Sequence, residues 1–136
     1  MGHVNVQITL KNACDVINVQ RGIITEPEIR QTTVDTMVDT GSTMLVINRE
    51  VFDKLGLSTK GEKNVSFANN DKAVCKMTEP VEIHWEDRFF SMPALLVDDA
   101  SEILLGVLPL EGMDLIVDPI RQKLVGAHGD TPMCYC

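Results

Sequence analysis

The stretch Thr36-Met37-Val38-Asp39-Thr40-Gly41-Ser42-Thr43-Met44-Leu45-Val46-Ile47 decides how this chain is interpreted. Apolar residues lead up to a carboxylate, a tight turn containing glycine follows, and an apolar run then resumes. An Asp between two apolar runs costs free energy unless another group pairs with it. The Asp-Thr-Gly triplet occurs once in the 136 residues. Asp39 is therefore the first candidate for a functional residue, and the alternative is an ordinary turn aspartate at a strand end.

Length and composition place the chain among globular proteins. A chain of 136 residues has the length of one ordinary domain, so a single domain over residues 1–136 is expected. Hydrophobic residues make up 44% of it, which is enough for a core, and the abundance of Val, Ile and Leu favours strands. The formal net charge of −8 opposes a general affinity for nucleic acid.

The chain shows no sign of membrane or export targeting. No apolar run approaches the length of a membrane span, and the first residues lack a signal-peptide pattern. Four cysteines are scattered at Cys14, Cys75, Cys134 and Cys136, which is typical of reduced thiols in the cytosol. We therefore expect a cytoplasmic protein that does not bind a membrane. The pair Cys134 and Cys136 is open to two interpretations, a metal or redox pair and a frayed tail with free thiols.

Short alternating segments predict an all-β domain. Val4, Val6, Ile8 and Leu10 alternate with polar residues, which indicates a half-buried strand. A turn is expected over residues 12–15, followed by a second strand over 16–19. Further strands are expected over residues 30–39, in a hairpin with a polar tip near residues 69–71, and over 81–85, 89–97, 103–105, 115–117 and 123–125.

Two short helices interrupt this pattern. Asn48 can cap a helix over residues 49–55, and Ile47 and Phe52 are spaced to form a hydrophobic staple across its first turn. Gly56 follows as a stop signal. A second short helix is expected near residues 107–111.

These segments, in this order, resemble the retropepsin-like aspartic peptidases of the retroviral and small bacterial type, over roughly residues 4–125. The first match is the loop Val38-Asp39-Thr40-Gly41-Ser42-Thr43, and the second is the helix ending in Lys54-Leu55-Gly56-Leu57. The third is Phe67-Ala68-Asn69-Asn70-Asp71, where the family places the tip of its flap hairpin. The fourth is Ile103-Leu104-Leu105-Gly106, followed by a helix and Val117-Asp118-Pro119.

The resemblance implies a closed, barrel-like all-β domain with a flap hairpin and one or two short helices. It also implies a set of site residues, which fall into three groups. The catalytic group is Asp39, Thr40 and Gly41; the substrate-binding group is Ser42, Thr43, Ala68, Asn69, Asn70 and Asp71; Leu105 and Gly106 are structural and lie beneath the catalytic loop.

The implied activity is that of an aspartic endopeptidase, a hydrolase that acts on an extended peptide or protein. In the family two Asp-Thr-Gly loops meet, and their carboxylates share one proton because they lie too close for both to ionise easily. One loop per chain therefore implies a homodimer in which each chain supplies its own Asp39. Thr40 would hydrogen-bond to the partner loop, Gly41 would allow the tight turn, and Ser42 would donate to a catalytic carboxylate. No cofactor or metal is implied, and no spacing of Cys and His is typical of zinc.

Two departures from the family pattern leave alternatives open. Retroviral members often carry Arg-Asp after the second glycine, where this chain has Val107-Leu108, so a dimer-stabilising ion pair of that form is not expected. The flap tip has Asn70 where a glycine is common. The rival function is a catalytically inactive dimer of the same fold that binds peptides or acts as a scaffold. Ser42 as a turn hydroxyl and residues 69–71 as an ordinary hairpin tip are the corresponding alternatives for the site.

Overall fold

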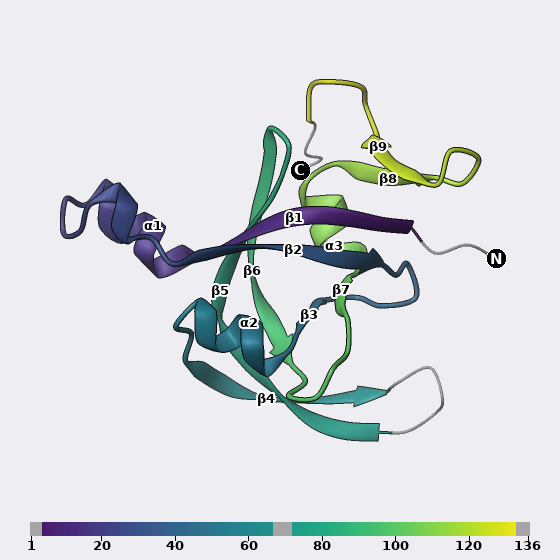
Figure 1. Ribbon diagram of the computed structural model, residues 1–136. Coiled ribbons are helices and arrows are strands. Elements are labelled where there is room, and N and C mark those ends of the chain that lie inside the picture. The colour runs from purple at the N-terminus through teal and green to yellow at the C-terminus, as the bar shows by residue number, and fades with distance from the viewer. Residues whose placement is uncertain (1–3, 67–71, 133–136) are drawn as a thin grey trace.

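The computed structural model describes residues 4–66 and 72–132, and strands dominate it (Figure 1). The elements in chain order are β1 (Val4–Asn12), α1 (Ala13–Gln20), the 3-10 turn η1 (Glu26–Glu28), β2 (Gln31–Val38), β3 (Leu45–Ile47), α2 (Arg49–Lys54), β4 (Thr59–Ser66), β5 (Lys72–Trp85), β6 (Arg88–Leu96), β7 (Ile103–Leu105), α3 (Val107–Gly112), β8 (Leu115–Asp118) and β9 (Lys123–Gly126).

Six strands close into a barrel. Their order is β1-β2-β7-β3-β6-β5, and β5 pairs back onto β1 to complete the circle. Strand β4 pairs with β5 outside this circle, and β8 and β9 form a separate two-stranded sheet (Figure 1). Most pairs are antiparallel, but β2 runs parallel to β7 and β3 runs parallel to β6. The predicted all-β, closed and barrel-like fold with few short helices is confirmed.

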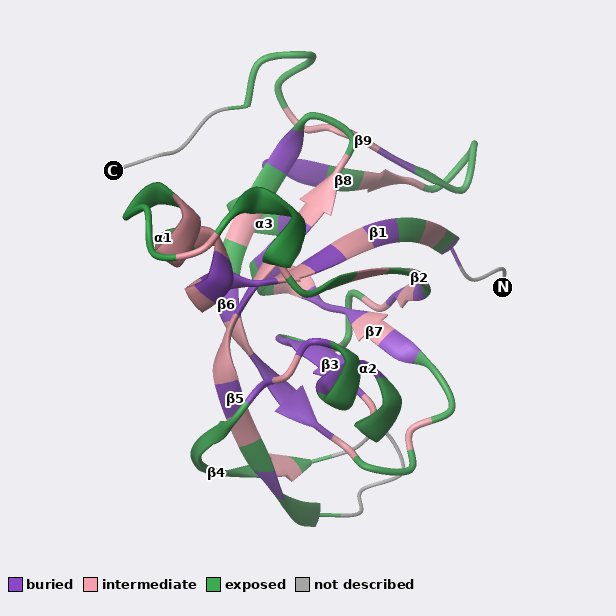
Figure 2. Cartoon of the chain, turned by 60° about the vertical axis from the view of Figure 1, so that its left-hand side comes forward, coloured by how far each residue is buried: buried purple, intermediate pink, exposed green. Residues whose placement is uncertain are grey.

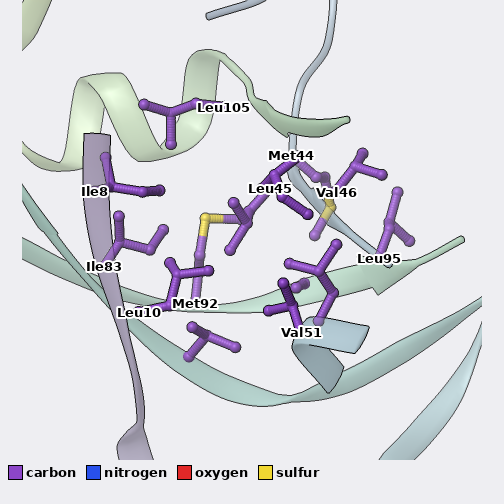
Figure 3. Close-up of a cluster of buried hydrophobic side chains, with 14 of the residues drawn as sticks. Ile8, Leu10, Met44, Leu45, Val46, Val51, Ile83, Met92, Leu95 and Leu105 are labelled. Carbon is purple, nitrogen blue, oxygen red and sulfur yellow. The ribbon is translucent and has the colours of Figure 1, made fainter. Parts of the chain in front are cut away.

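The core fills the barrel because the strands alternate between apolar and polar residues. Ile8 and Leu10 of β1 point inward and meet Ile83 of β5, Leu45 of β3 and Leu105 of β7, all of which are essentially inaccessible to solvent (Figure 3). Along β1 and β5 in Figure 2, purple bands of buried residues alternate with pink and green bands of more exposed ones, as the sequence alternation predicts. Each such side chain contributes about 1.5–3 kcal/mol through removal of apolar surface from water.

Both predicted helices and the predicted hairpins are present. The Asn48 side chain accepts a hydrogen bond from the Val51 amide at 3.0 Å, so it caps α2 as expected. Gly56 follows α2 with a φ of +61°, a left-handed conformation that favours glycine. The hairpins β4–β5, β5–β6 and β8–β9 and the helix α3 lie where the sequence predicts them.

The prediction of a turn over residues 12–15 and a strand over 16–19 is wrong, because helix α1 occupies this region. Asn12 is the N-cap, and its side chain accepts from the Asp15 amide at 3.1 Å. The Asn12 Nδ2 group also donates to the Leu55 carbonyl at 2.8 Å, which ties this end of the helix to the barrel. The β-branched residues that suggest a strand are outweighed by this capping and by an ion pair whose carboxylate is buried.

The ion pair joins Asp15, in the first turn of α1, to Arg30, the residue before β2. The guanidinium of Arg30 donates to both carboxylate oxygens at 2.9 Å, and its backbone amide donates to Oδ2 at 3.0 Å. The Asp15 side chain is only 8% exposed. These hydrogen bonds to Arg30 hold the pKa of Asp15 below its ordinary value, although burial acts in the opposite direction.

We expect Asp15→Asn to destabilise the protein at neutral pH by about 2 kcal/mol, because hydrogen bonds to a charged group are lost in a buried place. A depressed carboxyl pKa contributes stability above the unfolded-state pKa, and this contribution disappears as the pH falls through the folded-state pKa. The difference between wild type and variant should therefore shrink in acid. Urea unfolding at neutral pH and at about pH 3 measures it.

Asp53→Asn on α2 is the matched control. Asp53 is 66% exposed and lies 3.9 Å from the Arg49 guanidinium, so its removal should cost less than about 0.5 kcal/mol at either pH. An Asp15→Asn variant as stable as this control would contradict the anchoring role of the ion pair.

Candidate active site

Asp39 follows directly after β2, at the point where β7 separates β2 from β3. Val38 is the partner of Leu105 in the parallel pair, and the Asp39 amide donates to the Leu105 carbonyl at 3.0 Å. The chain then loops over the end of β7 and returns as β3, which pairs with the other edge of β7 (Figure 1). The position of Asp39 is thus set by strands on both sides of the loop, and its side chain is half-buried.

The loop closes on the Asp39 carboxylate. The Gly41 amide donates to Asp39 Oδ1 at 2.9 Å, and the Ser42 amide donates to the Asp39 carbonyl at 3.0 Å. A Cβ atom at Gly41 would lie 3.2 Å from the same Oδ1, closer than most real Cβ contacts. Glycine therefore keeps the backbone donor next to the carboxylate. Thr40 and Gly41 are exposed at the surface of the single chain.

Backbone hydrogen bonds fix the loop to the start of helix α3. The amides of Val107 and Leu108 donate to the carbonyls of Ser42 and Thr43 at 2.8 and 2.9 Å, and the Gly106 amide donates to the Met44 carbonyl at 3.1 Å. The first amides of a helix lack partners inside it, and no side chain caps α3. The loop carbonyls supply these partners, so loop and helix stabilise each other.

At position 106 there is no room for a side chain. A Cβ atom there would lie 2.6 Å from the carbonyl oxygens of Ser42 and Met44 and 2.7 Å from the Thr43 carbonyl carbon. All three are backbone atoms, so no side-chain rotation could make room. The φ of −90° is open to any residue. Close approach of the loop is therefore the reason for glycine at this position.

The structure brings together one part of the predicted site. Within the loop, Asp39 bonds through its amide to Leu105, and the backbone of Ser42 and Thr43 passes close to Gly106 at the start of α3. The predicted flap residues Ala68, Asn69, Asn70 and Asp71 lie outside the described residues, whereas the stem of their hairpin is described and is paired from Thr59–Thr78 to Ser66–Lys72. The contributions of Met44, Val107 and Leu108 were missed at the sequence level because they come from backbone groups, which leave no side-chain signal.

The side chains of the loop make few contacts within the chain. Among the residues that the structure describes, the carboxylate of Asp39 has no ion pair, and the hydroxyl groups of Thr40 and Ser42 make no hydrogen bond. The predicted donation from Ser42 to a catalytic carboxylate therefore stays a prediction.

The described parts of the chain offer no metal centre and no membrane helix. In residues 4–66 and 72–132, no three His, Cys, Asp or Glu side chains lie close enough to hold a metal ion together. No helix in these residues is long and apolar enough to cross a membrane. Cys134 and Cys136 lie outside the described residues.

Two solved structures share the fold at low sequence identity. The retroviral protease-like domain of Ddi1 from Leishmania major has a TM-score of 0.59 and 11% identity, and the match covers 99% of this chain and 96% of that one. A retropepsin-like aspartic protease from Rickettsia conorii has a TM-score of 0.50 and 18% identity, with 86% of this chain and 77% of that one covered. At these identities the likeness shows the fold and no more. A search of curated protein sequences found no match.

A family model identifies the chain more directly. The model described as aspartyl protease matches residues 25–108, which is more than half of the chain and includes the loop at Asp39 and the glycine at position 106. Together with the closed barrel and the strand–loop–strand arrangement around β7, this match shows that the chain belongs to the aspartyl protease family and has a retropepsin-like fold.

Proposed function

We propose that the chain is an aspartic endopeptidase that works as a homodimer, in a single domain over residues 1–136. The observation that carries the proposal is the geometry of Asp39. Its carboxylate lies half-buried at the end of a parallel strand pair, and the Gly41 amide donates to it at 2.9 Å. The loop itself is held by backbone hydrogen bonds to α3. These hydrogen bonds hold the carboxylate in a defined position, which supports a role for it in catalysis.

The reaction would be peptide-bond hydrolysis by water. One carboxylate of the Asp39 pair, in its ionised form, takes a proton from a bound water while the water oxygen attacks the scissile carbonyl carbon. The other, protonated, carboxylate donates to the carbonyl oxygen. The resulting diol then collapses, the C–N bond breaks, and the amine leaves with a proton from the pair. Neither a covalent enzyme intermediate nor a cofactor is needed.

The second chain is proposed to meet this one across the loop. Thr40 and Gly41 are exposed, and Leu108 of α3, whose amide donates to the Thr43 carbonyl of the same loop, is a 42% exposed apolar residue. An apolar side chain next to an exposed, incomplete site supports an interface there. At such an interface each Asp39 would face its copy and each Thr40 hydroxyl would gain a partner.

We expect Leu108→Asp to weaken the dimer by about tenfold or more and to lower specific activity in parallel, because an unpaired charge would be buried at the interface. Sedimentation velocity and peptidase activity, both measured over a range of protein concentrations, test this. The control is Ile23→Asp, at a 65% exposed apolar residue in the connection between α1 and η1, which should change neither quantity. A fully active monomer would rule out the shared site.

The activity is tested by incubating the protein with an unfolded protein substrate at acidic to neutral pH, with and without pepstatin. Cleavage that pepstatin blocks supports the proposal. A dimer that binds the substrate without cutting it at any pH would instead favour the rival function, a peptide-binding or scaffolding module.

A further inference from the structure

A groove of about 390 Å³ lies along β2, where it is lined by residues 32–37 of that strand, by Asn5 of β1 and by residues 101–103, which lead into β7. Helix α2 forms the opposite wall, and Figure 1 shows α2 below β2. None of the described residues that line it belongs to the loop 39–43 or to the β4–β5 hairpin. Its polar and charged lining includes Thr33, Asp35, Glu50, Lys54 and Glu102.

The groove exists because β7 covers only part of β2. Strand β7 is three residues long and pairs with Thr36 to Val38, so residues 31–35 of β2 have no described strand on that side. Their other side pairs with β1 along its whole length. The first half of β2 is thus a sheet edge that opens into a groove.

Two hydrogen bonds establish which backbone groups face this edge. The Arg30 carbonyl accepts a hydrogen bond from the Asn12 amide, so the backbone carbonyl of Arg30 points toward β1. The Asp39 amide donates to the Leu105 carbonyl, so the backbone N–H of Asp39 points toward β7. Backbone groups alternate sides along a strand, and therefore the N–H and C=O groups of Thr33 and Asp35 point into the groove. No described strand pairs with them there.

The charge around the edge is negative. Asp35, Glu50 and Glu102 supply three carboxylates, and Lys54 supplies one ammonium group that lies 3.2 Å from Glu50. Asp35 and Glu102 have no ion pair among the described residues. A charge on an edge strand normally deters pairing with another strand. Carboxylates deter acidic and apolar strands, but they attract a strand that carries lysine or arginine.

We propose that the edge of β2 at Thr33 and Asp35 binds an extended, cationic peptide segment as an added strand, and that this segment belongs to the protein substrate. The main-chain groups of Thr33 and Asp35 supply the hydrogen bonds, and Asp35 and Glu102 select the positive side chains. The groove thereby holds the substrate at a second place, apart from the scissile bond. The claim that the segment belongs to a substrate rests on the proposed function, whereas the claim that the edge binds a cationic strand does not.

Hydrogen exchange at single amides tests the strand pairing. The probe is a capped heptapeptide in which lysine alternates with valine or threonine, added to the Asp39→Asn protein so that no cleavage occurs. We expect the Thr33 and Asp35 amides to gain about tenfold or greater protection, and those of Thr32 and Val34, already bonded to β1, to stay unchanged. Unchanged protection at Thr33 and Asp35 would overturn the proposal. If the Thr33 and Asp35 amides were already protected without peptide, and this protection disappeared on dilution, the edge would pair with a second copy of the chain. That result would also overturn the proposal.

Charge-reversal variants test the selection of cationic peptides. Asp35→Lys combined with Glu102→Lys should weaken binding of the heptapeptide by about tenfold or more at low salt. Glu26→Lys combined with Asp130→Lys makes the same change of net charge at exposed residues outside the groove and should leave most of the affinity intact. If the groove variant does not fold, Asp35→Asn with Glu102→Gln should still weaken binding, by about threefold.

Equal losses in the groove and control variants would mean general attraction to an acidic protein and would overturn the proposal. So would full affinity for a peptide N-methylated on its backbone, which keeps its charges but cannot donate to the edge. Because every binding measurement uses the Asp39→Asn protein, its outcome is independent of peptidase activity. A lack of peptidase activity is therefore distinguishable from a lack of peptide binding in the groove.

Discussion

Asp39→Asn is expected to remove peptidase activity while leaving the protein folded and dimeric. Asparagine has nearly the same shape as aspartate, and its side-chain oxygen can still accept the 2.9 Å hydrogen bond from the Gly41 amide. It can neither take a proton from water nor carry the shared proton, so general acid–base catalysis is lost. The expected fall in kcat is about 10²–10⁴-fold. Steady-state kinetics on a peptide substrate measure it, and sedimentation reports on the dimer.

Asp87→Asn, in the exposed turn between β5 and β6, is the matched control and should retain full activity. The two variants should unfold at similar urea concentrations because neither side chain is part of the core. Substantial hydrolysis by pure Asp39→Asn protein, still sensitive to pepstatin, would refute the assignment of Asp39 to the reaction.

The elements that sequence predicts well are those with local causes. The strand β1 follows from strict alternation over Val4 to Leu10, and α2 follows from the Asn48 cap and the Gly56 stop, all within a few residues. Helix α1 has a distant cause. Its anchor is the pairing of Asp15 with Arg30, fifteen residues later in the chain, and the β-branched residues between them suggest a strand. Tertiary contacts overrode local propensity there.

The candidate site likewise has features that sequence can predict and features that it cannot. Asp39, Thr40 and Gly41 are recognisable as a motif, and the family resemblance places Leu105 and Gly106 beneath them. The bonds that hold the loop run between backbone groups more than sixty residues apart, such as Val107 to Ser42. Backbone groups are identical in every non-proline residue, so no residue type signals them. The groove beside β2 is hidden for a related reason, since it depends on β7 pairing with only three residues of β2.

Gly106→Ala is the second change with a large expected effect. The added methyl group would lie 2.6 Å from two carbonyl oxygens of the loop, so the loop must move away from α3. Overpacking of this kind costs about 1–3 kcal/mol of stability. The larger effect is on catalysis, because the displaced segment carries Asp39, and a displacement of about 1 Å costs on the order of 10²-fold in rate. Urea unfolding and kcat/KM, measured on the same preparation, give both numbers.

Gly22→Ala separates the loss of activity from the loss of stability. Gly22 has a φ of +72°, and apart from its own chain neighbours no residue has an atom within 4 Å of the place that a Cβ methyl group would take, so alanine there is strained only by its backbone. The expected cost is about 1–2 kcal/mol, close to that of Gly106→Ala, but at the turn after α1 rather than at the loop. If both variants lose stability and only Gly106→Ala loses activity, the contact between Gly106 and the loop is what positions the catalytic carboxylate. Equal activity in the two variants would mean that the loop tolerates displacement and that the α3 contact serves folding instead.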